Sequence, residues 1–205
     1  MKDELPGRYQ TAKKIFREHD GLLRTSQALD LGIAPPTLYE MRDRGLLIRE
    51  SPGLYRLASA EPLNYPDLVT IAMKVPKAVV ALTTALAYYG LTTQIPSRVW
   101  FALPRGTKKP RIEHPPIAVV HMSPRSYQAG MITIQLDGKE VQIYSPEKTV
   151  ADCFKFRGRI GEEIAIEALK DYFGQQEIKI NKLMEYAKIN RVDKVMLPYL
   201  KSETI

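Results

Sequence analysis

The side chains of residues 36–44 have the chemistry needed to contact the bases of DNA. If this segment is a helix with Leu38 and Met41 on its buried face, its polar side chains point outward or lie on the flanks. Thr37 can touch a thymine methyl group or a phosphate, and Glu40 can accept a hydrogen bond from the amino group of cytosine. The segment therefore predicts a helix that reads bases in the major groove. Its candidate contact residues are Pro36, Thr37, Tyr39, Glu40 and Arg44.

Several cations outside this segment could contact the phosphates of a duplex. Residues 105–111 place four of them in seven positions between two predicted strands. Each phosphate that such a group neutralises adds roughly 0.9 to the salt dependence of binding, but contacts of this kind carry no sequence information. The other interpretation of residues 105–111 is an exposed hairpin loop whose charges are only solvated. The candidate phosphate contacts are Arg44, Arg49, Arg56, Arg105, Lys108 and Lys109.

The overall charge favours an anionic partner. The chain has 30 Lys and Arg residues against 23 Asp and Glu residues, a formal net charge of +7. Residues 59–158 hold most of this excess, with 12 basic and 7 acidic residues. A basic balance of this size is typical of proteins that bind nucleic acid, although it says nothing about the fold.

Length and composition restrict the class of protein further. The 205 residues, 44% hydrophobic and 26% charged, are typical of a soluble globular protein with one large domain or two modest ones. The longest apolar run, Ala78–Leu82, is far shorter than the ~18 residues of a membrane span. The single cysteine, Cys153, excludes a disulfide framework and fits a reducing compartment. We therefore expect a cytoplasmic protein that has no membrane partner.

No pattern of catalytic or metal-binding residues stands out. A metal-dependent nuclease needs two or three carboxylates around its metal, and the acids near predicted strands are Glu113, Asp137 and Glu140. Asp137 belongs to an Asp-Gly turn, however, and Glu140 is expected on a solvent-facing strand edge. Cys153 lies in an apolar-periodic stretch, which predicts a buried thiol rather than a nucleophile. We expect no catalytic residue, no metal ion and no cofactor.

Residues 1–58 are predicted to form a winged helix-turn-helix domain. Thr25 can cap a short second helix, and Pro35-Pro36 can begin the third because proline is tolerated in a first turn. A two-stranded ribbon after a recognition helix is typical of a winged helix, whose usual partner is DNA and whose alternative partner is a protein. The predicted elements are helices over 9–19, 25–31 and 36–44 and strands over 46–49 and 54–57.

Residues 67–205 are predicted to form a mixed α+β domain with a small sheet and a helical C-terminal part, after a linker over 58–66. Residues 78–81 fit either a strand or a helix start, and Ser145 can cap the helix that follows the sheet. The fold class is therefore α+β. The predicted strands are 98–103, 117–122, 131–136 and 141–144, and the helices are 67–74, 85–89, 147–155, 162–173, 180–189 and 192–201.

Motifs in both predicted domains resemble the AbiEi-type antitoxins of bacterial type IV toxin–antitoxin systems, which are also transcriptional regulators. Ser145-Pro146-Glu147-Lys148-Thr149 is close to that family's Ser-Pro-Glu-Arg-Thr signature, with Lys148 in place of the usual arginine. The matching segments are Thr25–Ala28, Gly32-Ile33, Gly45–Leu47, Gly53–Leu57, Ala85–Leu91 and Ser145–Asp152.

The resemblance implies an autorepressor that binds inverted repeats in double-stranded DNA upstream of its own operon. It also implies an antitoxin that counters a nucleotidyltransferase-like toxin without forming a stable complex with it. Two alternatives remain at this point. One is a stand-alone transcription factor whose C-terminal domain binds an effector or another copy of itself, and the other, less favoured, is a metal-dependent nuclease.

Overall fold

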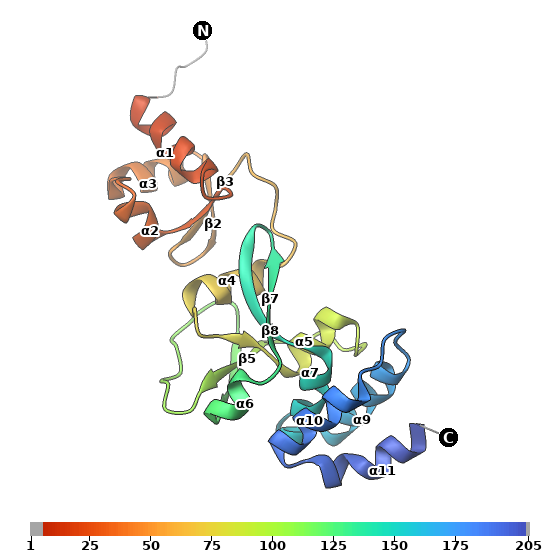
Figure 1. Ribbon diagram of the computed structural model, residues 1–205. Coiled ribbons are helices and arrows are strands. Elements are labelled where there is room, and N and C mark those ends of the chain that lie inside the picture. Colours follow the sequence, from red (N-terminus) through yellow and green to blue (C-terminus); the bar gives the residue numbers. More distant parts are fainter. Residues whose placement is uncertain (1–5, 204–205) are drawn as a thin grey trace.

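The computed structural model describes residues 6–203 and contains two sheets, each with its own helices (Figure 1). The chain is thus α+β, as predicted. Residues 1–5 and 204–205, which the predicted domains include, lie outside the described residues. The part before residue 58, here called the N-terminal unit, consists of α1 (Gly7–Arg17), β1 (Leu22–Arg24), α2 (Thr25–Asp30), α3 (Pro35–Asp43), β2 (Leu47–Ser51) and β3 (Leu54–Leu57).

The core of the N-terminal unit lies between its helices and a three-stranded sheet of order β1-β3-β2. Tyr9 and Phe16 of α1 and Leu38 and Met41 of α3 are fully buried at helical spacing, which is the pattern that predicted both helices. After α3 the chain reverses at Gly45, whose φ of +69° is readily available only to glycine. Strands β2 and β3 then form the expected hairpin.

One strand in this unit was missed and one expected helix cap was wrong. Strand β1, of only three residues, was not predicted, and it pairs with β3 because the chain turns back at Gly21 (φ +74°). Thr25 does not cap α2: the cap is a hydrogen bond of 3.0 Å from the Arg24 backbone N–H to the Gln27 side chain. The Thr25 backbone N–H instead donates to the Gly53 carbonyl at 2.9 Å, which fixes the hairpin turn against the start of α2.

The C-terminal unit, residues 66–203, is a five-stranded sheet of order β6-β5-β4-β8-β7 between two apolar layers. Helix α4 covers one face, and α5, α7 and the helices after α7 cover the other (Figure 1). No helix within residues 6–203 has the length and apolar character needed to cross a bilayer. The elements are α4 (Pro66–Lys74), β4 (Val79–Val80), α5 (Leu82–Tyr89), β5 (Val99–Pro104), β6 (Ile117–Met122), α6 (Pro124–Gln128), β7 (Met131–Leu136), β8 (Lys139–Tyr144), α7 (Pro146–Lys155), α8 (Arg157–Ile160), α9 (Glu162–Phe173), α10 (Ile180–Asn190) and α11 (Asp193–Glu203).

The connection between β5 and β6 is not a hairpin loop. These strands are parallel neighbours, paired from Val99–Ile117 to Pro104–Met122. The end of β5 and the start of β6 therefore lie at opposite ends of this strand pair, and residues 105–116 must return along the length of the strands. As a result, the basic segment 105–111 extends beside α4 instead of forming a short turn (Figure 1).

Apolar and polar contacts join the two units to each other and to the connecting residues 58–65. Leu22 and Leu54 of the small sheet belong to the same apolar cluster as α4 and the large sheet. Lys139, at the start of β8, donates to the His19 carbonyl at 2.7 Å and to the Asp20 carboxylate at 3.0 Å. Asp137, at the tip of the β7–β8 hairpin, accepts from the connecting segment: the backbone N–H groups of residues 64 and 65 lie 3.0 and 2.9 Å from its oxygens.

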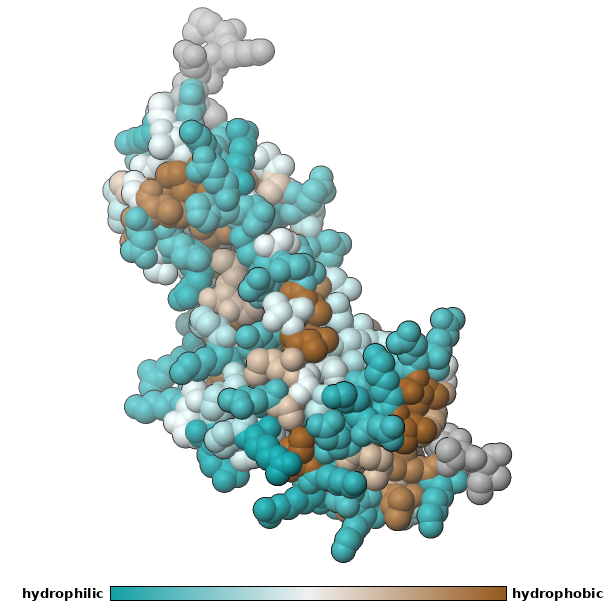
Figure 2. Space-filling view, in the orientation of Figure 1, coloured by the Kyte–Doolittle hydropathy of each residue, from teal (hydrophilic) through white to brown (hydrophobic). Residues whose placement is uncertain are grey.

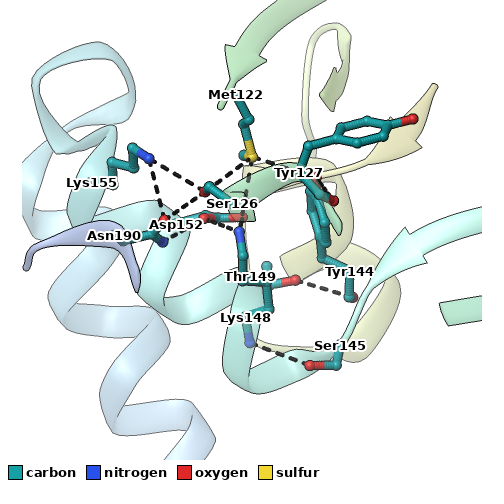
Figure 3. Close-up of polar contacts among 10 residues, drawn as sticks. All are labelled: Met122, Ser126, Tyr127, Tyr144, Ser145, Lys148, Thr149, Asp152, Lys155 and Asn190. Carbon is teal, nitrogen blue, oxygen red and sulfur yellow. Dashed lines mark hydrogen bonds and ion pairs between the residues drawn. The ribbon is translucent and has the colours of Figure 1, made fainter. Parts of the chain in front are cut away.

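A buried ion pair on α7 ties the sheet to the C-terminal helices (Figure 3). The Lys148 and Asp152 side chains are both fully buried, and the Lys148 ammonium donates to both oxygens of the carboxylate. Asn190 of α10 donates to Asp152 at 2.6 Å, and Ser126 of α6 donates to Asn190 at 2.8 Å. The Lys148 ammonium also lies 4.3 Å from the centre of the Tyr144 ring. Each charge therefore has close partners in place of water.

Because this pair is shielded from water, removing one partner leaves a buried charge uncompensated. We expect Asp152→Ala to lower the free energy of unfolding by about 3–5 kcal/mol, measured by urea denaturation. The double variant Lys148→Met/Asp152→Asn should recover part of the lost free energy of unfolding because it leaves no unpaired buried charge. Lys14→Met, which breaks the exposed Lys14–Glu18 pair, serves as the control and should leave stability unchanged. A loss for Asp152→Ala no larger than for the control would contradict this account.

Candidate nucleic-acid interface

Three of the five predicted contact residues of segment 36–44 lie on the solvent side of α3 or directly after it. Pro36, Tyr39 and Arg44 are exposed, and Tyr39 keeps 42% of its surface accessible. Arg42, which was not predicted, places its guanidinium 5.3 Å from the centre of the Tyr39 ring and donates to Asp43 at 2.8 Å. The Arg44 guanidinium lies 5.4 Å from the centre of the Tyr9 ring. The face therefore offers exposed aromatic and guanidinium groups, which can contact nucleic acid.

The other two predicted contacts on α3 face the protein. Thr37 keeps only 7% of its surface exposed because it precedes Leu38 and lies one turn before Met41, on the buried side of the helix. The Glu40 carboxylate accepts from the Tyr9 hydroxyl and from the Arg8 guanidinium, both at 2.6 Å. Thr37 is therefore removed from the interface, and Glu40 already has two hydrogen-bond donors within the unit.

Arg49 and Arg56 were both predicted to contact phosphates, but only Arg49 is exposed. Arg56 lies on β3, the central strand of the small sheet, and keeps 6% of its surface exposed. Its guanidinium donates to Glu50 at 2.5 Å and to the carbonyls of Leu57 and Ala60 at 3.2 and 2.6 Å. We correct this assignment: Arg56 holds the hairpin and the chain after it together, and it does not face solvent.

A groove of about 1020 Å³ lies between the two units. The hairpin turn Pro52-Gly53 and the start of α2 line one side, and the end of α4 and residues 109–113 line the other. Thus the turn of the hairpin faces the C-terminal unit. Four cations from both units line this groove, together with the single carboxylate of Glu113; they are Arg24, Lys74, Lys109 and Arg111.

Lys74 of α4 lies close enough to Arg24 and Arg49 of the N-terminal unit for their charges to act on it. Partial burial lowers the pKa of Lys74, and the charges of Arg24 and Arg49 lower it further, while Glu113 acts in the opposite direction. The Arg24 guanidinium is held in place by a 3.1 Å hydrogen bond to the Met73 carbonyl. An anion beside Arg24 and Lys74 would relieve the repulsion between them, so this part of the groove is electrostatically suited to a phosphate.

Some side chains of the basic segment 105–111 line the groove, and others lie on the open surface. Arg105, Lys108 and Lys109 are all exposed, and of these three only Lys109 is among the residues that line the groove. Arg111 belongs to the same basic segment and could have been chosen from the sequence. Arg24 and Lys74 could not, because they are isolated cations that only the packing of α4 against the small sheet brings together.

The acids and the cysteine that could serve enzymatic chemistry do not form a site. Within residues 6–203, no three side chains of His, Cys, Asp or Glu are arranged so that they could hold a metal ion. Asp137 binds the connecting segment, as described above, and hydrogen bonds from Asn64 and Tyr65 lower its pKa against the opposing effect of burial. Cys153 is fully buried, and burial raises the pKa of its thiol.

One family model matches part of the N-terminal unit. Residues 10–58 match the family described as "Transcriptional regulator, AbiEi antitoxin", which confirms the resemblance over this part of the chain. No curated protein matches the chain. The structure is similar to the crystal structure of the RV2827C protein from Mycobacterium tuberculosis, with a TM-score of 0.60 and 14% sequence identity, over 90% of this chain and 72% of that one. At this identity the likeness shows a shared fold.

The different surroundings of Arg56 and Arg49 predict different effects of their replacement. Arg56→Ala removes the charge partner of Glu50 and the hydrogen bonds to the Leu57 and Ala60 carbonyls, so we expect the free energy of unfolding to fall by about 3 kcal/mol. Arg49→Ala should leave the unfolding transition unchanged because its side chain is exposed. Thermal and urea unfolding of both variants measure this. Equal stability of the two variants would show that the Arg56 contacts do not hold the hairpin.

Proposed function

We propose, starting from the match of residues 10–58 to the AbiEi antitoxin regulators, that the protein is a sequence-specific DNA-binding repressor. In this proposal residues 1–58 act as a winged helix-turn-helix domain that binds an inverted-repeat operator. Residues 67–205 act as an antitoxin-like domain, and 58–66 as the linker. The protein is cytoplasmic and needs no cofactor or catalytic residue.

Helix α3 enters the major groove with its exposed face toward the bases. Tyr39 packs on the base edges, and Arg44 reaches a base edge or a flanking phosphate. Glu40 contributes by orienting Arg8 and Tyr9 instead of accepting from cytosine, because both groups already bond to it. This arrangement is supported by the exposure of α3 and by the family match.

The sugar–phosphate backbone beside that major groove runs through the groove between the units. The single observation that carries this proposal is the gathering of Arg24, Lys74, Lys109 and Arg111 around one space from two separate parts of the chain. The C-terminal unit thereby adds affinity without reading sequence, and Arg105 and Lys108 continue the positive surface outward. Occupancy of a promoter in this way would block transcription.

The antitoxin role rests on the family match and on the Ser145–Thr149 signature. Its counterpart would be a nucleotidyltransferase-like toxin, which the C-terminal unit counters without a stable complex. In this structure the signature forms the start of α7: the Ser145 hydroxyl accepts from the Lys148 backbone N–H at 3.3 Å, and Lys148 enters the buried ion pair. We infer that Lys148 serves the stability of the C-terminal unit, because its ammonium is fully buried and does not meet solvent.

A fluorescence anisotropy titration against the protein's own upstream DNA, with a scrambled duplex as control, tests the DNA-binding proposal. Tyr39→Ala and Arg44→Ala should each weaken binding to the native duplex by about 1–3 kcal/mol and affect the scrambled duplex less. Lys109→Gln/Arg111→Gln should weaken binding to both duplexes equally. The same double variant should lower the slope of log K against log salt by roughly 0.9 for each phosphate that is no longer neutralised.

The matched control is Lys188→Gln/Lys194→Gln, which removes the same charge from α10 and α11, far from the groove (Figure 1). If this control lowers the slope as much as the groove variant does, the C-terminal contribution is only a matter of net charge. If the native and scrambled duplexes bind equally in every variant, α3 does not read bases.

A further inference from the structure

The outer edge of β7 is an open strand edge. β7 is the last strand of the five-stranded sheet: β8 pairs with one side of it, and none of the described strands pairs with the other. Apolar residues are visible in the middle of Figure 2, where Figure 1 draws β7 and β8. An unpaired edge presents a row of backbone donors and acceptors, which is a template for another strand.

The ladder between β7 and β8 shows which groups point outward. The Ser145 backbone N–H donates to the Gly130 carbonyl at 2.8 Å, and these two residues are opposite in the same antiparallel register. In such a ladder every second residue bonds to the partner strand. The backbone groups that bond to β8 are therefore those of residues 132, 134 and 136. The backbone groups that point outward, away from β8, belong to Met131, Thr133 and Gln135.

The other sheet edges carry features that discourage pairing, and β7 does not. On β6 the Val119 carbonyl accepts from the Arg159 guanidinium at 3.1 Å, so a charged side chain occupies part of that edge. Strand β2 carries Arg49 and Glu50, and β1 is only three residues long. The six residues of β7, Met-Ile-Thr-Ile-Gln-Leu, contain no charge and no proline.

The sequence of β7 is complementary to itself in one antiparallel register. With Thr133 opposite Thr133 of a second copy, Met131 lies opposite Gln135, so all outward-pointing residues pair with each other. The same register places Ile132 opposite Ile134 on one face of the sheet. Ile132 is 40% exposed in the single chain, and a cross-strand pair of β-branched residues would cover it.

We propose that two copies of this protein associate through antiparallel pairing of β7 with β7, with a two-fold axis at Thr133. The interface is isologous, as in most dimers, and joins the two sheets into one continuous sheet. Its area is that of a small interface, below about 1,200 Å², so the association is weak and reversible. The inference goes beyond the DNA-binding proposal and does not rest on it.

Disulfide trapping tests the register in the full-length chain. Cys153 is fully buried, so a cysteine introduced on β7 is the accessible thiol. Thr133→Cys should form covalent dimers under mild oxidation at least tenfold faster than Gln135→Cys. In the proposed register two copies of residue 135 lie ~13 Å apart along the strands, beyond the ~7 Å limit between Cα atoms for a disulfide. Equal rates for the two variants would overturn the proposal.

Thr133→Pro provides a second test that leaves the fold intact. Because the Thr133 N–H points away from β8, proline removes an intermolecular donor without breaking the internal ladder. Sedimentation analysis over a concentration series should show reversible dimers for the unmodified chain and monomers for Thr133→Pro, with the same circular dichroism spectrum. An unmodified chain that stays monomeric at several hundred micromolar, or dimers that persist in Thr133→Pro, would refute the proposed edge.

Discussion

The ion pair between Lys148 and Asp152 is the constraint on which the C-terminal unit depends. Both charges are removed from water, and such a pair is tolerated only when its remaining hydrogen-bonding capacity is filled. The partners that fill it come from separate elements: Asn190 from α10, and through it Ser126 from α6. The sheet, the short helix α6 and the C-terminal helices must therefore be in place together before either charge is satisfied.

The position of α4 connects this unit to the candidate interface. One side of α4 packs on the large sheet and on the leucines of the small sheet, while its end carries Lys74 into the groove. The same packing holds the hairpin turn Pro52-Gly53 opposite residues 109–113. The apolar contact between the units thus sets the distances between the cations of the groove, which lie outside the apolar core.

The local pattern of apolar and polar residues predicted most helices and strands, but it predicted the residues of the candidate nucleic-acid interface only in part. Strands 117–122 and 131–136 and helix 162–173 have the predicted bounds, because side-chain periodicity is a property of each segment alone. Thr37 and Arg56 were misplaced because their burial depends on which strand or helix face meets the core. The parallel pairing of β5 and β6 and the meeting of Arg24 with Lys74 are tertiary relations between distant residues, which a single sequence does not reveal.

The contact of Leu22 and Leu54 with α4 has a consequence for how such chains can be recombined. The segment that matches the regulator family ends at residue 58, yet two side chains within it complete a core that begins at residue 68. Grafted onto an unrelated partner, this segment would carry an uncovered apolar spot at its junction. A functional chimera would need a recipient helix that offers a matching apolar surface, so the boundary of the family segment is not the boundary for transplantation.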